Sequence, residues 1–212
     1  MNYQSHQREL LDQLKLIVGQ KNYEEEQSRM SSYLVDWGNK YQGISLLILK
    51  PINTQMVSEI LIFCNKFKIG VVPQGGNTGL VGGSVPSDSG QEIVISLEKM
   101  NKILDIDTSN FTMTLEAGCI LFEVQEAAKK VDRMFPLSLA SEGSCQIGGN
   151  LSTNAGGTAV LRYGNTKELV LGIEVVMPNG EIINQLRRLR KDNTGYDIKQ
   201  LFLGAEGTLG II

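Results

Sequence analysis

Two clusters of glycine are the residues of this chain whose type and spacing most directly imply chemistry. The 212 residues include 23 glycines, of which five lie between Gly75 and Gly83 and six more between Gly143 and Gly164. Because glycine has no Cβ, a run of glycines lets consecutive main-chain N–H groups come close to an anion. The two clusters together therefore predict a binding site for a ligand that contains phosphate.

The first cluster, residues 73–84, has the sequence PQGGNTGLVGGS and follows an expected buried strand. We expect its main-chain N–H groups to bind a diphosphate, with Thr78 and Ser84 as additional hydroxyl donors. A Walker loop would need a lysine after the glycines, and the spacing differs from the G-x-G-x-x-G of dinucleotide sites. Taken alone, the cluster is equally consistent with a structural glycine turn. A branched side chain at Gly76 is expected to prevent diphosphate binding and to leave the fold intact.

The second cluster lies in residues 139–157, which read LASEGSCQIGGNLSTNAGG. Small residues with many hydroxyl and amide groups suit the wall of a large flat ligand that accepts and donates hydrogen bonds along its edges. We expect Asn150, Thr153 and Asn154 to begin a short helix, since the N-terminus of a helix favours phosphate.

The elements that must position these clusters can be predicted from hydrophobic periodicity. Apolar residues at helical spacing predict helices over 6–18, 54–68 and 121–131. Strands are predicted over 45–49, 69–72, 92–96, 111–116, 169–177 and 181–185, with another beginning at 209. Residues 20–43 are polar and are expected to be an irregular lead-in. A βαβ pattern with parallel strands gives way to hairpins near residue 100, which predicts two α+β lobes rather than one doubly wound sheet.

Composition excludes several classes of protein. The net charge of −3 does not suit a nucleic-acid binder, and the basic run 187–191 is expected to be a solvated hairpin end. No apolar run is long enough to span a membrane. Three cysteines without C-x-x-C spacing predict no disulfide framework, and the only histidine, His6, is expected on the surface, so no metal site is predicted. The absence of an export signal favours a cytoplasmic location.

Three motifs together resemble those of a known family. They are residues 73–84, residues 143–157, and residues 189–197 running into 204–210. From about Tyr33 onward the chain resembles the FAD-linked oxidases of the vanillyl-alcohol-oxidase and PCMH type. Within that family the resemblance is to the enzymes that act on D-2-hydroxy acids: D-2-hydroxyglutarate dehydrogenase, D-lactate dehydrogenase and the flavin subunit of glycolate oxidase. A cell-wall reductase of the same fold is a weaker alternative, because residues 192–197 and 206–210 do not suit it.

The resemblance implies an α+β fold, a PCMH-type FAD-binding domain of two α+β subdomains with FAD between them. Residues 1–40 would be an N-terminal helix and lead-in, and residues 41–212 the FAD-binding domain. Its subdomains would cover about 41–100 and about 101–212, the second cut short at its C-terminal end. The substrate domain of the family is expected to be absent.

The resemblance also implies which residues bind the cofactor. The main-chain N–H groups of Gly75 to Gly79 would hold the diphosphate, residues 140–157 would pack along the cofactor, and residues 206–212 would close its other side. The expected cofactor-binding residues are Pro73, Gln74, Gly75, Gly76, Asn77, Thr78, Gly79, Leu80, Gly83, Ser84, Ala140, Ser141, Gly143, Ser144, Gly148, Gly149, Asn150, Thr153, Asn154, Gly156, Gly157, Glu206, Gly207 and Ile211.

The mode of flavin attachment follows from one position of the first cluster. Asn77 stands where some members carry a flavin-linked histidine, so non-covalent FAD is expected. Cys145 is expected to be a buried thiol rather than a flavin tether. Arg162, Lys191 and Tyr196 belong to segments that resemble the family, but no role can be assigned to them.

The function implied is that of the FAD-binding portion of an FAD-dependent D-2-hydroxy-acid dehydrogenase of the 2-hydroxyglutarate, lactate or glycolate class. Such an enzyme transfers a hydride from the substrate α carbon to the flavin and needs a base for the hydroxyl proton. The catalytic residues are expected in the missing C-terminal domain, so this chain alone is expected to be inactive. Expected partners are a small 2-hydroxy acid and an electron acceptor protein or quinone, and apolar surface left uncovered favours self-association. The alternative is a shortened or split flavin-binding module without catalysis of its own.

Overall fold

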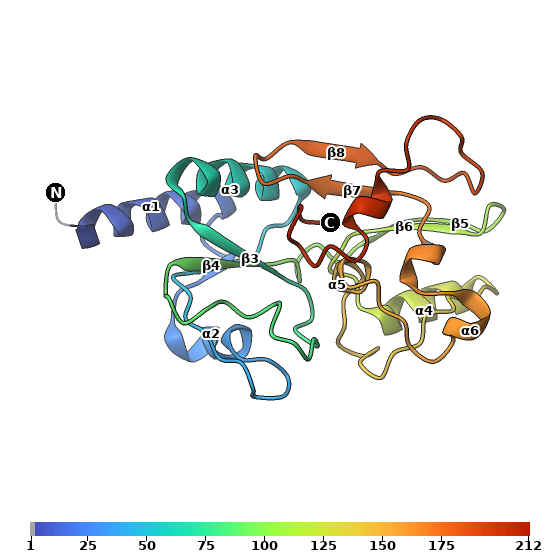
Figure 1. Cartoon of the computed structure of the whole chain (residues 1–212), viewed down its shortest axis with the longest axis horizontal. Coiled ribbons are helices and arrows are strands. Elements are labelled where there is room, and N and C mark those ends of the chain that lie inside the picture. Colours follow the sequence, from blue (N-terminus) through green and yellow to red (C-terminus); the bar gives the residue numbers. More distant parts are fainter. Residues whose placement is uncertain (1–2) are drawn as a thin grey trace.

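The computed structural model describes residues 3–212, and within the first helix it describes side chains from Gln7 onward. The expected surface position of the His6 side chain lies outside these described residues. Elements from roughly the first hundred residues gather on one side of the molecule, and later elements gather on the other (Figure 1). The β7–β8 hairpin is the exception, because it reaches back over the first group.

The first lobe is built on a four-stranded sheet with the order β1-β2-β4-β3. Its strands are β1 (Tyr23–Glu24), β2 (Ile48–Leu49), β3 (Gly70–Gln74) and β4 (Glu92–Ser96). The expected parallel arrangement is confirmed for β2, β4 and β3, although β4 lies between the other two. Pro73 lies within β3 rather than after it, and this edge strand tolerates a residue without an N–H group.

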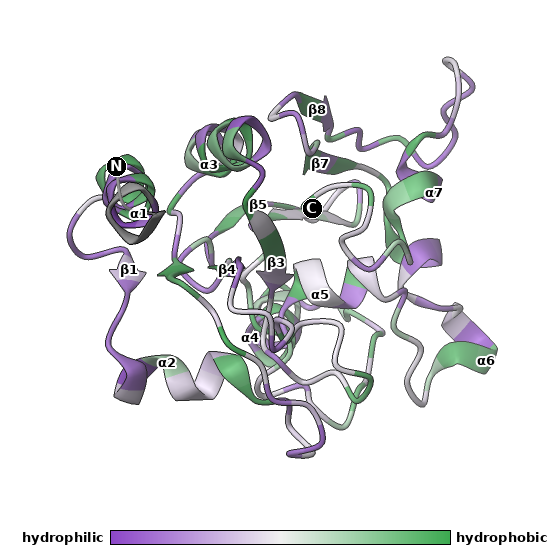
Figure 2. Cartoon of the chain, turned by 60° about the vertical axis from the view of Figure 1, so that its left-hand side comes forward, coloured by the Kyte–Doolittle hydropathy of each residue, from purple (hydrophilic) through white to green (hydrophobic). Residues whose placement is uncertain are grey.

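Both faces of this sheet are buried, because alternate residues of its strands point to opposite sides. Leu49, Ile93 and Ile95 join a core cluster with residues of α1 and α3, whereas Ile48 and Val94 pack with α2. The three helices are α1 (Tyr3–Val18), α2 (Gln27–Leu34) and α3 (Thr54–Phe67). Figure 2 shows that α1 and α3 carry both hydrophobic and hydrophilic residues around their circumference, as expected for helices that cover a sheet.

The expectation of an irregular lead-in over residues 20–43 is wrong, because this segment contains both β1 and α2. Helix α2 has no side-chain hydrogen bond at its N-cap, Glu26, and only Met30 and Leu34 are buried. Two apolar residues in eight leave too little periodicity to predict a helix. Contacts with the rest of the fold therefore stabilise α2.

The second lobe contains two separate two-stranded hairpins and short helices. Its elements are β5 (Ile103–Asp107), β6 (Thr112–Leu115), α4 (Leu121–Lys130), α5 (Ile147–Ser152), α6 (Val160–Tyr163), the 3-10 helix η1 (Thr166–Leu169), β7 (Ile173–Val176), β8 (Ile182–Gln185) and α7 (Lys199–Phe202). The α4 helix and the β7–β8 hairpin are confirmed, although β7 begins at Ile173 rather than at residue 169, which ends η1. The strand β5 was not predicted. The strand expected from residue 209 is only a single bridge between Ile211 and Val176. Within the described residues, no helix is long and apolar enough to cross a membrane.

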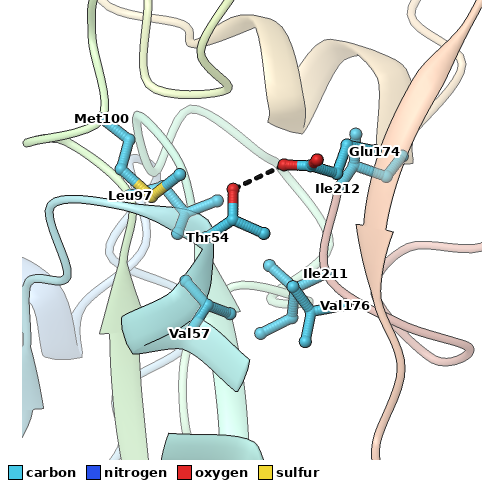
Figure 3. A pocket seen from close by; sticks show the side chains of 8 residues that line it. All are labelled: Thr54, Val57, Leu97, Met100, Glu174, Val176, Ile211 and Ile212. Atoms are coloured by element: carbon cyan, nitrogen blue, oxygen red, sulfur yellow. Dashed lines mark hydrogen bonds between the residues drawn. The ribbon is translucent and has the colours of Figure 1, made fainter. Parts of the chain in front are cut away.

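The β7–β8 hairpin joins the two lobes through polar contacts with α3. Thr54 Oγ1 donates to Glu174 Oε1 at 2.5 Å (Figure 3). Ser58 Oγ donates to the Gly180 carbonyl oxygen at 2.5 Å. A methyl group at Gly180 would lie 2.2 Å from Ile62, and its φ of +85° is the left-handed region that favours glycine. The turn at Gly180 therefore sets how closely the hairpin approaches α3.

An apolar pocket of about 50 Å³ lies beside this junction, and Figure 3 shows its lining. Its residues come from both lobes and include Val57, Met100, Val176, Ile211 and Ile212. Val176 and Ile211 belong to the same core cluster as the first-lobe sheet. The pocket is therefore a packing defect between lobes, far too small for a dinucleotide.

The capping of α3 gives a test of the first lobe. Asn53 Oδ1 accepts a hydrogen bond from the Met56 N–H at 2.9 Å. Asn53→Ala removes this N-cap and is expected to lower the free energy of unfolding by about 1 kcal/mol. Urea denaturation measures the change, with Gln55→Ala in the same exposed turn as control. Equal stability of the two variants would show that the cap does not contribute.

Candidate cofactor-binding site

Three segments far apart in sequence meet beside the end of β3. They are the first glycine loop (residues 75–84), the second glycine segment (residues 139–157) and the C-terminal loop (residues 204–210). A methyl group placed at Gly76 would lie 2.0 Å from the Ser144 carbonyl oxygen, and one at Gly207 would lie 2.6 Å from Pro73 Cγ. The Glu206 N–H donates to the Ser152 carbonyl oxygen at 2.8 Å. The fold thus brings both glycine clusters and the C-terminal loop together.

The first glycine loop leaves its main-chain donors unused. Within the described part of the chain, no N–H group of residues 75–84 donates a hydrogen bond to another protein atom. Main-chain amides in folded proteins almost always have a partner, which here must be solvent or a ligand. Consecutive free amides in an irregular loop form a concave, partly positive surface that suits an anion.

Side chains in and beside this loop, in contrast, form hydrogen bonds to the protein that hold the loop in place. Gln74 is 2% exposed and its Nε2 donates to the carbonyl oxygens of Tyr33, at 2.9 Å, and Ser84, at 2.6 Å. Asn77 Nδ2 donates to the Val35 carbonyl oxygen at 2.8 Å. Ser84 Oγ donates to Asn77 Oδ1 at 2.8 Å, so the expectation that this hydroxyl is a free donor for phosphate is wrong.

The glycines of the site fall into two groups. A side chain at Gly76, Gly148, Gly157 or Gly207 would collide with protein atoms, because an added methyl group would lie between 2.0 and 2.7 Å from its nearest neighbour. These glycines are needed for internal packing. The expectation that valine at Gly76 would leave the fold intact is therefore wrong, since the Ser144 main chain occupies that space.

Gly79, Gly143 and Gly149 form the second group. A methyl group at any of them would meet nothing within 4 Å, and none has a φ in the left-handed region. Gly75 and Gly83 would make only ordinary van der Waals contacts, at 3.6 and 3.7 Å. Neither packing nor backbone conformation explains these glycines. They border open space that side chains would fill, as expected where a ligand approaches the main chain.

The second glycine segment does not begin its helix where the sequence predicted. Helix α5 starts at Ile147, so Asn150 lies inside it and Thr153 and Asn154 follow it. Asn150 is buried and its Nδ2 points to Cys145 Sγ at 3.6 Å. Thr153 Oγ1 donates to the Gly149 carbonyl oxygen, and Asn154 Oδ1 accepts from the Lys167 N–H. The helix starts earlier than predicted because the extended backbone at Gln146 makes that residue the N-cap. The three side chains therefore bond within the segment rather than at the start of a helix.

Gln146 is a candidate that sequence reasoning missed. Its side chain is 8% exposed, and its Oε1 has no hydrogen-bond partner within the described residues. It lies 3.6 Å from the position of a methyl group on Gly75. A buried amide without a partner costs about 1–3 kcal/mol, which a polar ligand would recover. Its position directly before the Ile-Gly-Gly stretch was the available signal.

The remaining expected residues take varied positions. Leu80, Ala140, Gly143, Ser144 and Glu206 are exposed, whereas Ser141 and Gly156 are half-buried. Ile211 is buried in the first-lobe core, which leaves its side chain no access to a ligand. Cys145 is a free thiol that is 2% exposed, which confirms the expected buried cysteine. Thr78 is half-buried, and its hydroxyl donates to no protein atom among the described residues.

A carboxylate fixes the loop beside the first glycine loop. Asp36 is buried, and hydrogen bonds from the N–H groups of Tyr41, Lys40 and Gly38 hold the pKa of its carboxyl below its usual value. This loop places the Tyr41 ring against Gly82, where an added methyl group would lie 2.7 Å from the ring. Asp36 therefore supports one wall of the site while remaining charged at neutral pH.

The three residues without an assigned role lie in polar surroundings. Arg162 stacks over the Tyr163 ring at 5.4 Å, and Lys191 is exposed. Tyr196 is 92% exposed and borders a polar pocket of about 290 Å³. No residue of either glycine cluster lines this pocket. The basic run is not fully solvated, because Arg188 pairs with Asp105 at 2.6 Å and Arg187 pairs with Asp192.

Solved structures share this architecture. The chain superposes on alkyldihydroxyacetonephosphate synthase with a TM-score of 0.85 at 23% identity, covering 97% of this chain and 39% of that one. It also superposes on Phl p 4.0202, described as a glucose dehydrogenase, with a TM-score of 0.77 at 18% identity, covering 96% of this chain and 42% of the other. At these identities the likeness establishes the fold alone.

Sequence relatives are much more similar. The chain is 50% identical over 198 residues to mitochondrial D-2-hydroxyglutarate dehydrogenase of Arabidopsis thaliana, covering 93% of this chain and 35% of that protein. It is 52% identical over 183 residues to D-2-hydroxyglutarate–pyruvate transhydrogenase of Saccharomyces cerevisiae, covering 86% of this chain and 36% of that protein. The zebrafish (Danio rerio) mitochondrial D-2-hydroxyglutarate dehydrogenase is 50% identical over 183 residues, and the match covers 86% of this chain and 34% of that protein. The chain thus spans about a third of the length of these relatives.

These relatives overturn one expectation from the sequence. A cytoplasmic location was inferred from the absence of an export signal, but the Arabidopsis and zebrafish relatives are named mitochondrial enzymes. The inference was wrong because the lack of a recognisable signal does not indicate a compartment.

The match to a family model agrees with the geometry of the site. The model described as "FAD binding domain" matches residues 45–185, well over half of the chain, and includes the first glycine loop and the second glycine segment. The same two segments meet in the fold; the first carries free amides, and both contain glycines that border open space. The chain therefore belongs to the family of FAD-binding domains.

Proposed function

We propose that this chain holds FAD non-covalently between its two glycine segments, as the flavin-binding part of an FAD-dependent D-2-hydroxy-acid dehydrogenase. The observation that carries the proposal is the run of free main-chain amides over residues 75–84, opposite a second glycine-rich wall. A diphosphate carries the charge and the acceptor oxygens that such a run requires. The side chain at position 77 is an amide already bonded to the protein, which supports non-covalent attachment.

The residues divide the work of binding between main chain and side chains. In this proposal the amides of Gly75 to Gly79 hold the diphosphate, with the Thr78 hydroxyl as a further donor. Gly143 and Gly149 let the flat part of the ligand approach the second wall, and Gln146 offers it a buried amide. Residues 206 and 207 close the remaining side. The other residues expected from the sequence stay candidates through their main-chain groups.

The bound cofactor would supply acceptance of a hydride from the α carbon of the hydroxy acid. The chain itself would bind the cofactor, orient it and shield it from water, which lowers the entropic cost of bringing the reactants together. A base is also needed for the hydroxyl proton. The only histidine in the sequence is His6, so we infer that a part of the enzyme outside these 212 residues supplies that base.

The relatives' names favour one substrate class and one compartment. D-2-hydroxyglutarate is the substrate we propose, ahead of lactate or glycolate, and mitochondria the location. We infer that electrons pass on to an acceptor protein or quinone. Exposed apolar side chains such as Leu161, Leu201 and Leu209 favour self-association of the isolated chain. A boundary between subdomains near residue 100 remains part of this proposal.

The cofactor proposal predicts that the purified chain binds FAD. Addition of FAD is expected to give a yellow protein after removal of free ligand, and acid precipitation is expected to release all of the flavin into solution. Absorbance spectra of the two fractions measure both results. A chain that stays colourless would refute FAD binding, and flavin retained in the precipitate would refute non-covalent attachment.

Two glycine variants separate ligand contact from internal packing. Gly79→Val is expected to raise the FAD dissociation constant at least about tenfold, because its side chain would fill open space beside the free amides. Its melting temperature without FAD should match that of the wild type. Gly76→Val should instead lower the melting temperature of the FAD-free chain, because it collides with Ser144. Unchanged FAD affinity in Gly79→Val would remove this loop from the site.

The substrate proposal requires a protein as long as the relatives. Under anaerobic conditions, D-2-hydroxyglutarate is expected to bleach the flavin absorbance of such a protein faster than D-lactate or glycolate does. The FAD-loaded 212-residue chain should show no bleaching with any of the three acids, since we infer that the base for the hydroxyl proton lies outside these residues. Bleaching by the short chain would contradict the inference about the base. If neither protein is bleached by any of the acids, a flavin-binding module without catalysis would be favoured.

A further inference from the structure

Helix α2 ends against the first glycine loop, and its C-terminal carbonyl groups are satisfied from there. The last carbonyl oxygens of a helix have no partner within it and must find donors elsewhere. Asn77 Nδ2 donates to the carbonyl oxygens of Val35 at 2.8 Å and Ser32 at 3.2 Å. Gln74 Nε2 donates to the carbonyl oxygen of Tyr33 at 2.9 Å. Two side-chain amides, one at the end of β3 and one in the loop, therefore cap α2.

The same two amides also close the loop upon itself. Gln74 Nε2 donates to the Ser84 carbonyl oxygen, and Asn77 Oδ1 accepts from Ser84 Oγ. Asn77 has a φ of +51°, in the left-handed region that asparagine tolerates better than most residues. Residues 74, 77 and 84 are thereby linked to each other and to one helix end. Between them the main-chain amides remain free.

Helix α2 is itself fixed to the end of the sheet. Its Tyr33 hydroxyl donates to both oxygens of Glu98, at 3.1 and 3.0 Å, and Glu98 pairs with Lys50 at 3.0 Å. Lys50 directly follows β2, and Glu98 follows β4 by two residues. Met30 and Leu34 of α2 pack against the same sheet. These contacts fix α2 in place against the sheet.

We propose that Asn77 and Gln74 are positioning residues for FAD, which tie the diphosphate-binding loop to the C-terminus of α2 and so keep its amides turned away from the protein. This inference rests on the proposed function, since it assigns a role within the same site. Helix α2 becomes part of the site although it offers no group to the ligand.

The physical reason is the cost of ordering a loop. A glycine-rich loop without anchors samples many conformations, in several of which its amides would bond to its own carbonyl oxygens. Binding would then have to pay for fixing the loop. Anchors that are formed before the ligand arrives remove that cost. Side-chain amides suit this role, because Asn77 donates to a carbonyl oxygen of α2 while it accepts from Ser84, and Gln74 donates to two carbonyl oxygens without bringing a charge into the protein.

Asn77→Gly tests the anchor without straining the backbone, because glycine tolerates the positive φ of this position. We expect the FAD dissociation constant of the 212-residue chain to rise about tenfold, as fits the loss of two or three hydrogen bonds. Asn39→Gly is the matched control. Asn39 has a φ of +53°, is exposed and makes no side-chain hydrogen bond within the described residues. Its FAD affinity should equal that of the wild type.

Hydrogen exchange supplies a readout that a merely structural role would not change. FAD is expected to slow amide exchange in residues 27–35 of the wild type, although α2 does not contact the ligand. In Asn77→Gly this FAD-dependent protection of α2 should disappear, even at FAD concentrations that saturate the variant. Gln74→Met, which keeps the buried volume and removes the donors, should lose part of the protection if it folds.

The outcomes separate this inference from the proposed function. If the wild type binds no FAD, the proposed function fails and the anchor has no ligand to position. If the wild type binds FAD but Asn77→Gly binds it equally well with unchanged protection of α2, only the anchor is refuted. A drop in the melting temperature of FAD-free Asn77→Gly with unchanged FAD affinity would likewise refute it, because the side chain would then stabilise only the fold.

Discussion

The structure depends on one constraint: a stretch of main chain must keep its amides free without losing its shape. Among the residues that the structure describes, none accepts a hydrogen bond from an N–H group of residues 75–84, which is rare for main chain in a folded domain. Such a loop cannot be held by its own backbone, so side chains must hold it. Gln74, Asn77 and Ser84 do so: Gln74 and Asn77 donate to carbonyl oxygens at the end of α2, and the Ser84 hydroxyl donates to Asn77. The two side-chain amides thus satisfy carbonyl oxygens at the end of the helix, and the helix in turn fixes the loop.

Glycine serves two different purposes around this site. At Gly76 and Gly207 the missing side chain lets separate segments pack against each other, which brings the three parts of the site together. At Gly79, Gly143 and Gly149 the missing side chain leaves open space, which nothing in the protein fills. The first kind brings the segments together, and the second kind leaves the space that the proposed ligand would occupy. Substitutions at the two kinds of position therefore act on different properties of the protein.

Contacts outside the two glycine segments also help to fix their relative position. The β7–β8 hairpin of the second lobe bonds to α3 of the first through Thr54 and Ser58, and Val176 joins the core of the first-lobe sheet. These contacts limit how far the lobes can separate. A ligand between the lobes would thus meet walls whose spacing is set before it binds, which reduces the entropic cost of binding.

The sequence by itself determined the elements whose signal is local. The periodic apolar residues of α3 and α4, the strand β4 and the glycine clusters are all recognisable along the chain, because helical spacing, β-branched runs and missing side chains need no partner to be read. Only the tertiary structure decided α2, the early start of α5 and the division of the glycines into two kinds. Helix α2 has just two buried residues and no side-chain hydrogen bond at its N-cap, so contacts with the sheet and with Asn77 and Gln74 stabilise it. The bonds from Gln74 and Asn77 join residues more than forty positions apart, and no local pattern records them.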